Sequence, residues 1–152
     1  MVSGQANKYF IMLEPSSATA GGTITSRTLD CKGAAAVSIV VQGSTSDAAT
    51  DNPSVLELQE CDTDTASSFA AVTAAKGDGA GGFVIPDSPT ATTNAAYVVF
   101  NVDTKPRKRY LRLVISPTTT QTYYAVAHFP AERMSEMPNT AAKQNASVVV
   151  NA

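Results

Sequence analysis

Histidine, tryptophan and charged residues are scarce in this chain. Only 16% of its 152 residues are charged, the formal net charge is −2, and tryptophan is absent. A nucleic-acid-binding domain needs a basic surface, and stacking platforms need more aromatic rings than five Tyr and five Phe supply. No apolar run approaches the roughly 18 residues of a membrane span, and no signal-peptide pattern is visible. We therefore expect neither a nucleic-acid nor a membrane partner.

Motifs for covalent catalysis are missing as well. The one histidine, His128, lies inside a predicted strand, and no Gly-x-Ser-x-Gly motif accompanies it. The two cysteines, Cys31 and Cys61, lie on different predicted strands with no CxxC or Cys/His spacing, so we expect free buried thiols in a reducing compartment. The sequence predicts a protein that is not an enzyme.

Two further segments share some residues with known ligand-binding loops but lack others that those loops require. Glu60, Asp62 and Asp64 bring three carboxylates together, but the residues that follow break the order of a calcium loop, so solvated turn residues are expected. The glycine-rich segment 77–82 lacks the Lys-Ser/Thr of a phosphate loop and indicates a flexible turn. We expect no metal and no cofactor.

Short segments of alternating apolar and polar residues fill most of the chain. Such period-2 patterns between turn signals are typical of strands with one buried face. The expected strands cover residues 9–13, 23–29, 35–42, 54–61, 69–73, 83–85 and 97–102, followed by two alternating runs, 111–116 and 123–129, interpreted as the arms of a hairpin within 98–129. The pattern predicts an all-β fold, a β-sandwich or jelly roll of about eight short strands with extended terminal arms.

The character of the chain changes at Pro130. We interpret residues 1–130 as the β-sandwich domain and 131–152 as a C-terminal arm, with one or two helical turns over 131–137. The closing residues Val148, Val149 and Val150 have two interpretations: they pair with an exposed sheet edge of a neighbouring subunit, or they form a final strand of the same sandwich.

Two segments are candidates for a subunit or capsid interface, together with the terminal valines. Residues 9–13 are apolar in both phases of the alternation, which exceeds what one buried sheet face requires. The second segment, which we call the basic cluster, is 105–112 and contains five of the eleven Lys and Arg residues. It has two interpretations: its cations pair with acidic groups of a partner, or they form a turn and one solvated strand face. The candidate residues are Tyr9, Phe10, Met12, Lys105, Arg107, Lys108, Arg109, Arg112, Val148, Val149 and Val150.

The order of several strands resembles a family of small virion proteins of tailed phages. The resemblance covers residues 54–142 and rests on the stretches Val55–Asp62, Val99–Asp103 and Arg107–Leu113, with the closing segments Ala131-Glu132-Arg133 and Pro138–Ala142. Cys61 stands where the family pattern would have a small polar residue. The members it resembles are head-decoration, or cement, proteins.

The resemblance implies a structural protein on the capsid exterior of a phage, assembled in the cytoplasm of the bacterial host. Its partners would be the major capsid protein and further copies of itself, as a homotrimer that cements neighbouring capsomers. We place the Tyr9–Leu13 strand and the 123–129 face near the subunit contact, and the basic cluster and terminal valines against a neighbour or the capsid. The alternative is a carbohydrate- or receptor-binding β-sandwich module of a phage tail or virion, which exposed tyrosines along a groove would favour.

Overall fold

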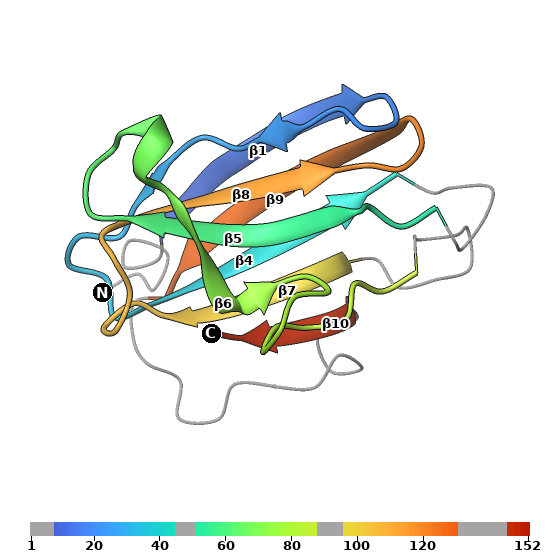
Figure 1. Ribbon diagram of the computed structural model, residues 1–152. Helices are drawn as coiled ribbons and strands as arrows, with labels where there is room; N and C mark the ends of the chain where they lie inside the picture. The colour runs from blue at the N-terminus through green and yellow to red at the C-terminus, as the bar shows by residue number, and fades with distance from the viewer. Residues whose placement is uncertain (1–7, 45–50, 88–95, 131–145) are drawn as a thin grey trace.

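Two stacked β-sheets make up the structure, a computed structural model that describes residues 8–44, 51–87, 96–130 and 146–152 (Figure 1). Sheet A contains, in spatial order, β1 (Lys8–Ala18), β9 (Gln121–Phe129), β4 (Ala36–Gly43), β7 (Ala96–Asp103) and β10 (Ala146–Asn151). Sheet B contains β2 (Ile24–Thr25), β8 (Tyr110–Ser116), β5 (Val55–Cys61) and β6 (Ala70–Lys76), and β3 (Leu29–Asp30) also pairs with β8. A 3-10 turn, Ala66–Ser68, precedes β6. The all-β sandwich predicted from the alternation is confirmed.

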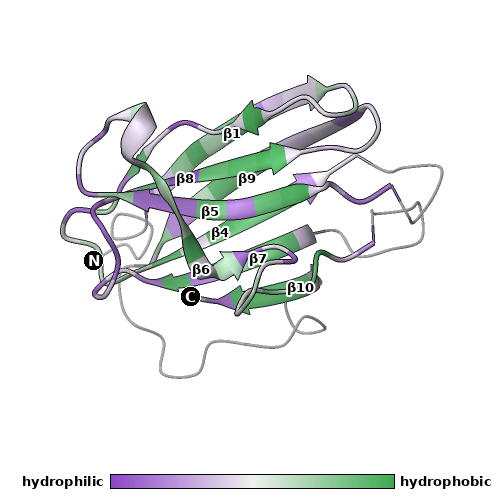
Figure 2. Cartoon of the chain, viewed as in Figure 1, coloured by the Kyte–Doolittle hydropathy of each residue, from purple (hydrophilic) through white to green (hydrophobic). Residues whose placement is uncertain are grey.

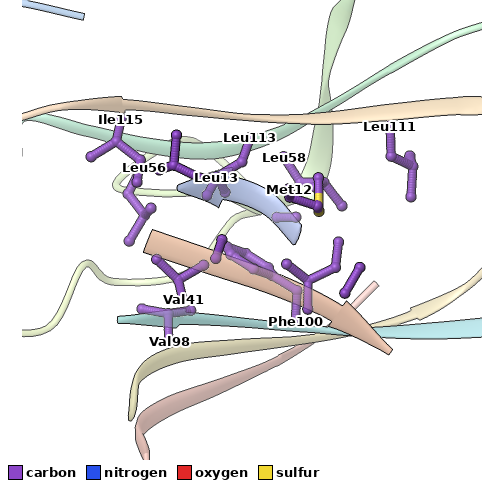
Figure 3. Packing of buried hydrophobic residues seen from close by; sticks show 14 of the residues in the cluster. Met12, Leu13, Val41, Leu56, Leu58, Val98, Phe100, Leu111, Leu113 and Ile115 are labelled. Atoms are coloured by element: carbon purple, nitrogen blue, oxygen red, sulfur yellow. The ribbon is translucent and has the colours of Figure 1, made fainter. Parts of the chain in front are cut away.

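The core lies between the two sheets and follows directly from the alternation. Leu56 and Leu58 on β5, and every second residue of β8, are apolar and buried, and hydrophilic and hydrophobic colours alternate along β5 in Figure 2. The inward side chains of sheet B meet those of sheet A in Figure 3, where Leu56, Leu113 and Ile115 face Val41 and Val98. Each of these side chains is fully buried, which contributes roughly 1.5–3 kcal/mol apiece.

β1 continues beyond the proline that was expected to end it. The strand runs through Pro15 to Ala18, so the prediction of a strand ending at Pro15 is wrong. β1 is an edge strand that pairs within its sheet with β9 alone, and an edge tolerates a residue without an N–H. Its pairing with β9 is irregular on both sides of Leu13. The irregularity turns two successive residues, Met12 and Leu13, into the core, with 0% and 6% of their surfaces exposed.

The two alternating runs within 98–129 do not form a hairpin. β8 belongs to sheet B, where it pairs with β2, β3 and β5, whereas β9 belongs to sheet A between β1 and β4. The chain therefore passes from one sheet to the other between Ser116 and Gln121. Alternation reveals which face of a strand is buried, but it does not reveal the strand that pairs with it.

The C-terminal valines pair within their own sandwich. β10 runs parallel to β7, with Val148 opposite Val98 and Val150 opposite Phe100. Val150 is 5% exposed and belongs to the main core. The described end of the segment 131–152 is thus a strand of sheet A, which is the second of the two interpretations of the terminal valines. The helical turn expected over 131–137 lies outside the described residues.

Two further strand predictions are only partly met. The segment 23–29 forms two separate two-residue strands, β2 and β3, because Ser26 between them bonds to Leu113 through its own backbone and hydroxyl. The segment 83–85 makes an isolated bridge from Phe83 to Gly77. β2 and β3 thus lie along the β8 edge of sheet B.

Candidate docking surface

The basic cluster is largely paired within the chain. Arg109 donates two hydrogen bonds to Asp30, from Nε to Oδ1 at 2.9 Å and from Nη2 to Oδ2 at 2.7 Å. These bonds, with a further one from the Lys32 backbone N–H, lower the pKa of Asp30 to about 2. The pair joins the residue just before β8 to the last residue of β3. Arg109 is therefore already engaged by a carboxylate of its own chain.

Two more cations of the cluster face acidic residues on or after β5. Arg107 Nη1 lies 3.8 Å from Glu60 Oε1, and Lys108 Nζ lies 3.6 Å from Asp62 Oδ2. The Lys108 backbone N–H donates to Glu60 Oε2 at 3.0 Å. Asp62 is an exposed bend residue, as expected, whereas Glu60 belongs to β5 and is largely buried, and both lie close to cations of the basic cluster.

Arg112 lies on the outward face of sheet B. Its guanidinium sits 4.2 Å from the centre of the Phe69 ring, and its Nε donates to Gln59 Oε1 at 2.8 Å. Gln59 in turn donates to Glu57 at 2.6 Å. Within the described residues, only the Lys105 ammonium of this cluster has no ion pair or hydrogen bond to a side chain. The cluster is a weak candidate for a free cationic surface.

The outward face of sheet A has a different composition. The registers of β1, β9, β4, β7 and β10 align an aliphatic residue from every strand in one row. The row consists of Ile11, Val126, Val40, Val99 and Val149. The next row of the same face consists of Tyr9, His128, Ser38, Asn101 and Asn151. Neither row contains a charged side chain.

The exposed apolar side chains concentrate at the β1 side of this face. Tyr9 is 71% exposed, Ile11 55%, Tyr124 39% and Val40 36%, and these are four of the five large exposed hydrophobic residues among the described positions. Val126 lies between Ile11 and Val40 in the aliphatic row. We call Tyr9, Ile11, Val40, Tyr124 and Val126 the docking face. Exposed apolar side chains that form a contiguous patch commonly mark interaction sites.

His128 lies beside the docking face without the geometry of a catalytic base. Its ring stacks on that of Tyr9, with centroids 4.7 Å apart and planes at 19°. Ser38 is its direct cross-strand neighbour, but the Ser38 hydroxyl donates to Asn101 Oδ1 at 3.1 Å. The His128 Nε2 atom is buried and has no hydrogen-bond partner among the described residues. The arrangement does not activate Ser38 as a nucleophile.

Both cysteines are free and buried, as the sequence predicted. Burial raises the pKa of Cys31 to about 12, which keeps this thiol protonated and unreactive. Burial also opposes ionisation of Cys61, but hydrogen bonds from the backbone and side chain of Thr63, and the charge of Lys108, leave its pKa below the usual value. Cys61 is only 3% exposed, so a reagent has little access to it.

Several predicted interface residues point into the protein. Met12 is fully buried, Phe10 packs partly against the core, and Val150 is a core residue. The prediction that these three residues form an interface is therefore wrong: their side chains lie on the inward face of sheet A and pack against the core. Tyr9 lies on the docking face, whereas Val148 and Val149 are half-buried. Tyr124 belongs to the 123–129 face that was placed near the subunit contact. Val40 was not among the candidates, although Ser38 and Gln42 share its phase and mark that phase as the outward one.

Comparison with known proteins adds no relationship to this description. No protein-family model matches the chain, and no curated protein matches it. The likeness of residues 54–142 to head-decoration proteins stays a prediction from the sequence. In the described residues, no helix has the length and apolar character needed to cross a membrane.

Proposed function

We propose that this protein is a virion structural protein that binds the outer surface of a tailed-phage capsid and cements neighbouring capsomers. The docking face carries the proposal, because it is an uncharged, partly apolar sheet surface suited to lasting protein contact. The strand motifs that resemble head-decoration proteins support it. The major capsid protein and further copies of the chain, as a homotrimer, would be the partners.

The energetics favour attachment through several copies. Fully burying one Ile, Val or Tyr side chain contributes roughly 1.5–3 kcal/mol, and part of that is already gained in the free protein. Association costs roughly 4–15 kcal/mol in lost freedom of motion, so one docking face gives only weak binding. Linking several such contacts raises the apparent affinity by about 10²–10⁴-fold. A cement protein gains its strength in this way.

Charge at the rim would act on the rate of attachment. Lys105 is exposed, and its ammonium is the one cation of the basic cluster left without a side-chain partner in the described residues. Contacts of this kind mainly set the encounter rate and its dependence on salt. The buried apolar contacts set the lifetime.

Co-sedimentation with phage heads tests the proposal. Heads are purified from a tailed phage whose genome carries this chain, after deletion of its gene, and are incubated with the purified protein. We expect wild-type protein to pellet with the heads and Lys105→Glu to bind more slowly, with a larger deficit at low salt than at high salt. Lys32→Glu, an exposed lysine next to β3, is the matched control. Failure of the wild-type protein to bind heads would contradict the proposal.

A carbohydrate- or receptor-binding module is the second candidate. The observation that favours it is the ring of Tyr9, which is 71% exposed on the same sheet face as the exposed Tyr124. Aromatic rings on a flat surface can stack on sugar rings. Under this alternative, a panel of bacterial surface glycans contains a ligand that binds wild-type protein and not Tyr9→Ala. Lack of any glycan binding together with binding to heads removes this candidate.

A further inference from the structure

Of the edge strands in the described part of the chain, β10 alone lacks a feature that hinders the addition of another strand. Such features include prolines, charged residues, irregular pairing and very short length. β1 contains Pro15 and pairs irregularly with β9, and its Met12 carbonyl already accepts a bond from the Arg27 N–H. β2 and β3 have two residues each, and β6 ends in a lysine. β10 lies at the outer edge of sheet A (Figure 1), and residues 146–151 contain neither proline nor charge.

The hydrogen bonds of β10 show which of its backbone groups point away from β7. The Ala152 N–H donates to the Asn101 carbonyl at 2.9 Å, and the Ala152 carbonyl accepts from the Asp103 N–H at 2.8 Å. Successive residues of a strand turn their backbone groups to opposite sides. Val149 and Asn151 therefore turn their N–H and C=O groups to the outer side of β10, where the described residues place no strand.

We propose that the outer edge of β10 receives an extended segment of the major capsid protein, which continues sheet A by one strand. This inference rests on the proposed function and identifies how the protein binds the capsid. It assigns the contact to backbone atoms of Val149 and Asn151, while β10 stays paired with β7 of its own chain.

The chemistry of this edge selects an extended and uncharged peptide. Free N–H and C=O groups along a strand are matched by the backbone of another strand, and side chains on either side set the specificity. The added strand would lie beside Val150 on the core side and beside Val149 and Asn151 on the outward side. A charge buried at these positions would find no counter-charge in β10.

A second copy of the chain is a poorer occupant of the same edge. In a cyclic trimer, β10 of one copy would have to pair with a different edge of the next copy. The other edges are hindered by the proline of β1, the shortness of β2 and β3, and the terminal lysine of β6. Two β10 strands could pair only with each other about a twofold axis, which gives a dimer and not the proposed trimer. The added strand is therefore assigned to the capsid protein.

A proline at position 149 tests the inference with phage heads that lack the protein. Val149→Pro removes an N–H that makes no bond to β7, whereas the matched control Val149→Ala keeps that N–H. Circular dichroism should show the same fold for both variants. In co-sedimentation with heads we expect an apparent affinity about tenfold lower for Val149→Pro than for Val149→Ala. Equal binding of the two variants, with wild-type protein bound, overturns the inference alone. Wild-type protein that binds no heads overturns the proposed function and the inference with it.

Hydrogen exchange of the wild-type protein, read by mass spectrometry, is a second measurement that needs no variant. The N–H groups of Val149 and Asn151 should exchange at least about tenfold more slowly on heads than in the free protein, whereas the Val150 N–H is protected in both states. Unchanged exchange at Val149 and Asn151 on bound protein overturns the inference. Protection of both groups in a dimer of the free protein would identify a second copy as the occupant and overturns it as well.

Discussion

Replacing Val150 by alanine tests whether the last strand belongs to its own sandwich. Val150 is 5% exposed in the main core, and the ladder of β10 continues with hydrogen bonds between Ala152 and Asn101 and between Asp103 and Ala152. The substitution removes two methyl groups, worth about 1.6 kcal/mol of transfer free energy, and leaves a small cavity. We expect the free energy of unfolding to fall by about 2 kcal/mol. Val149→Ala, half-buried on the outward face, should cost about half as much.

Urea denaturation followed by circular dichroism measures both effects. The midpoint should decrease while the slope m stays constant, since the native fold is retained. The comparison is made at two protein concentrations, because a strand that pairs within its own chain gives a loss that does not depend on concentration. A loss below about 0.5 kcal/mol for Val150→Ala, or a loss that depends on concentration, would refute the pairing of β10 with β7 in the same chain.

Three further perturbations follow from the described contacts. The pKa of Asp30 is about 2 in the folded protein, below the value of about 3.9 in unfolded chains. The contribution of the Asp30–Arg109 pair to stability is therefore complete above about pH 4–5 and is lost as the pH falls towards 2. Asp30→Asn should flatten the decrease of the urea midpoint over this range, and an unchanged decrease would contradict the pairing of Asp30 with Arg109. Cys31, whose pKa is raised to about 12, should react with a thiol reagent at pH 8 only after unfolding, and rapid reaction of the native protein would show that it is accessible. In Gly82→Ala the new Cβ would lie 1.8 Å from the Lys76 carbonyl oxygen, so thermal denaturation should show that the free energy of unfolding falls by more than about 1 kcal/mol. In the control Gly79→Ala the new Cβ meets only the flexible Lys76 side chain, so the free energy of unfolding should fall by less.

The strands could be predicted from the sequence because burial acts on neighbouring residues. The expected segment 54–61 corresponds to β5, Val55–Cys61, and 97–102 to β7, Ala96–Asp103. In β5 the side chains of the two phases meet different surroundings, and the alternation records that difference. β7 is instead a short apolar run whose residues 97–100 are buried in both phases. The class of fold follows from many such segments.

Pairing partners could not be predicted in the same way, because they lie far apart in the chain. The partner of Arg109 is Asp30, 79 residues away, and the backbone N–H of Lys108 bonds to Glu60, 48 residues away. Before folding is known, the cluster therefore looks like an unpaired cationic surface. The hairpin assigned to 98–129 failed for the same reason, since nothing local decides which sheet receives each strand.

The docking face could be predicted from the sequence only in part. Apolar residues in both phases of 9–13 indicated a surface beyond the core, and Tyr9 and Ile11 are exposed there. The phase was ambiguous, because the irregular pairing beside Leu13 turns both Met12 and Leu13 inward. Such an irregularity has no clear signature in a single sequence.

Electron cryomicroscopy of phage heads tests the central proposal most directly. Heads from a phage that carries this chain are compared with heads from the same phage after its gene is deleted, and with deleted heads to which purified protein is added back. We predict additional three-lobed density on the outer surface between neighbouring capsomers in the first and third samples, absent from the second. Identical head surfaces in all three samples, or density confined to the tail, would contradict the assignment as a capsid cement protein.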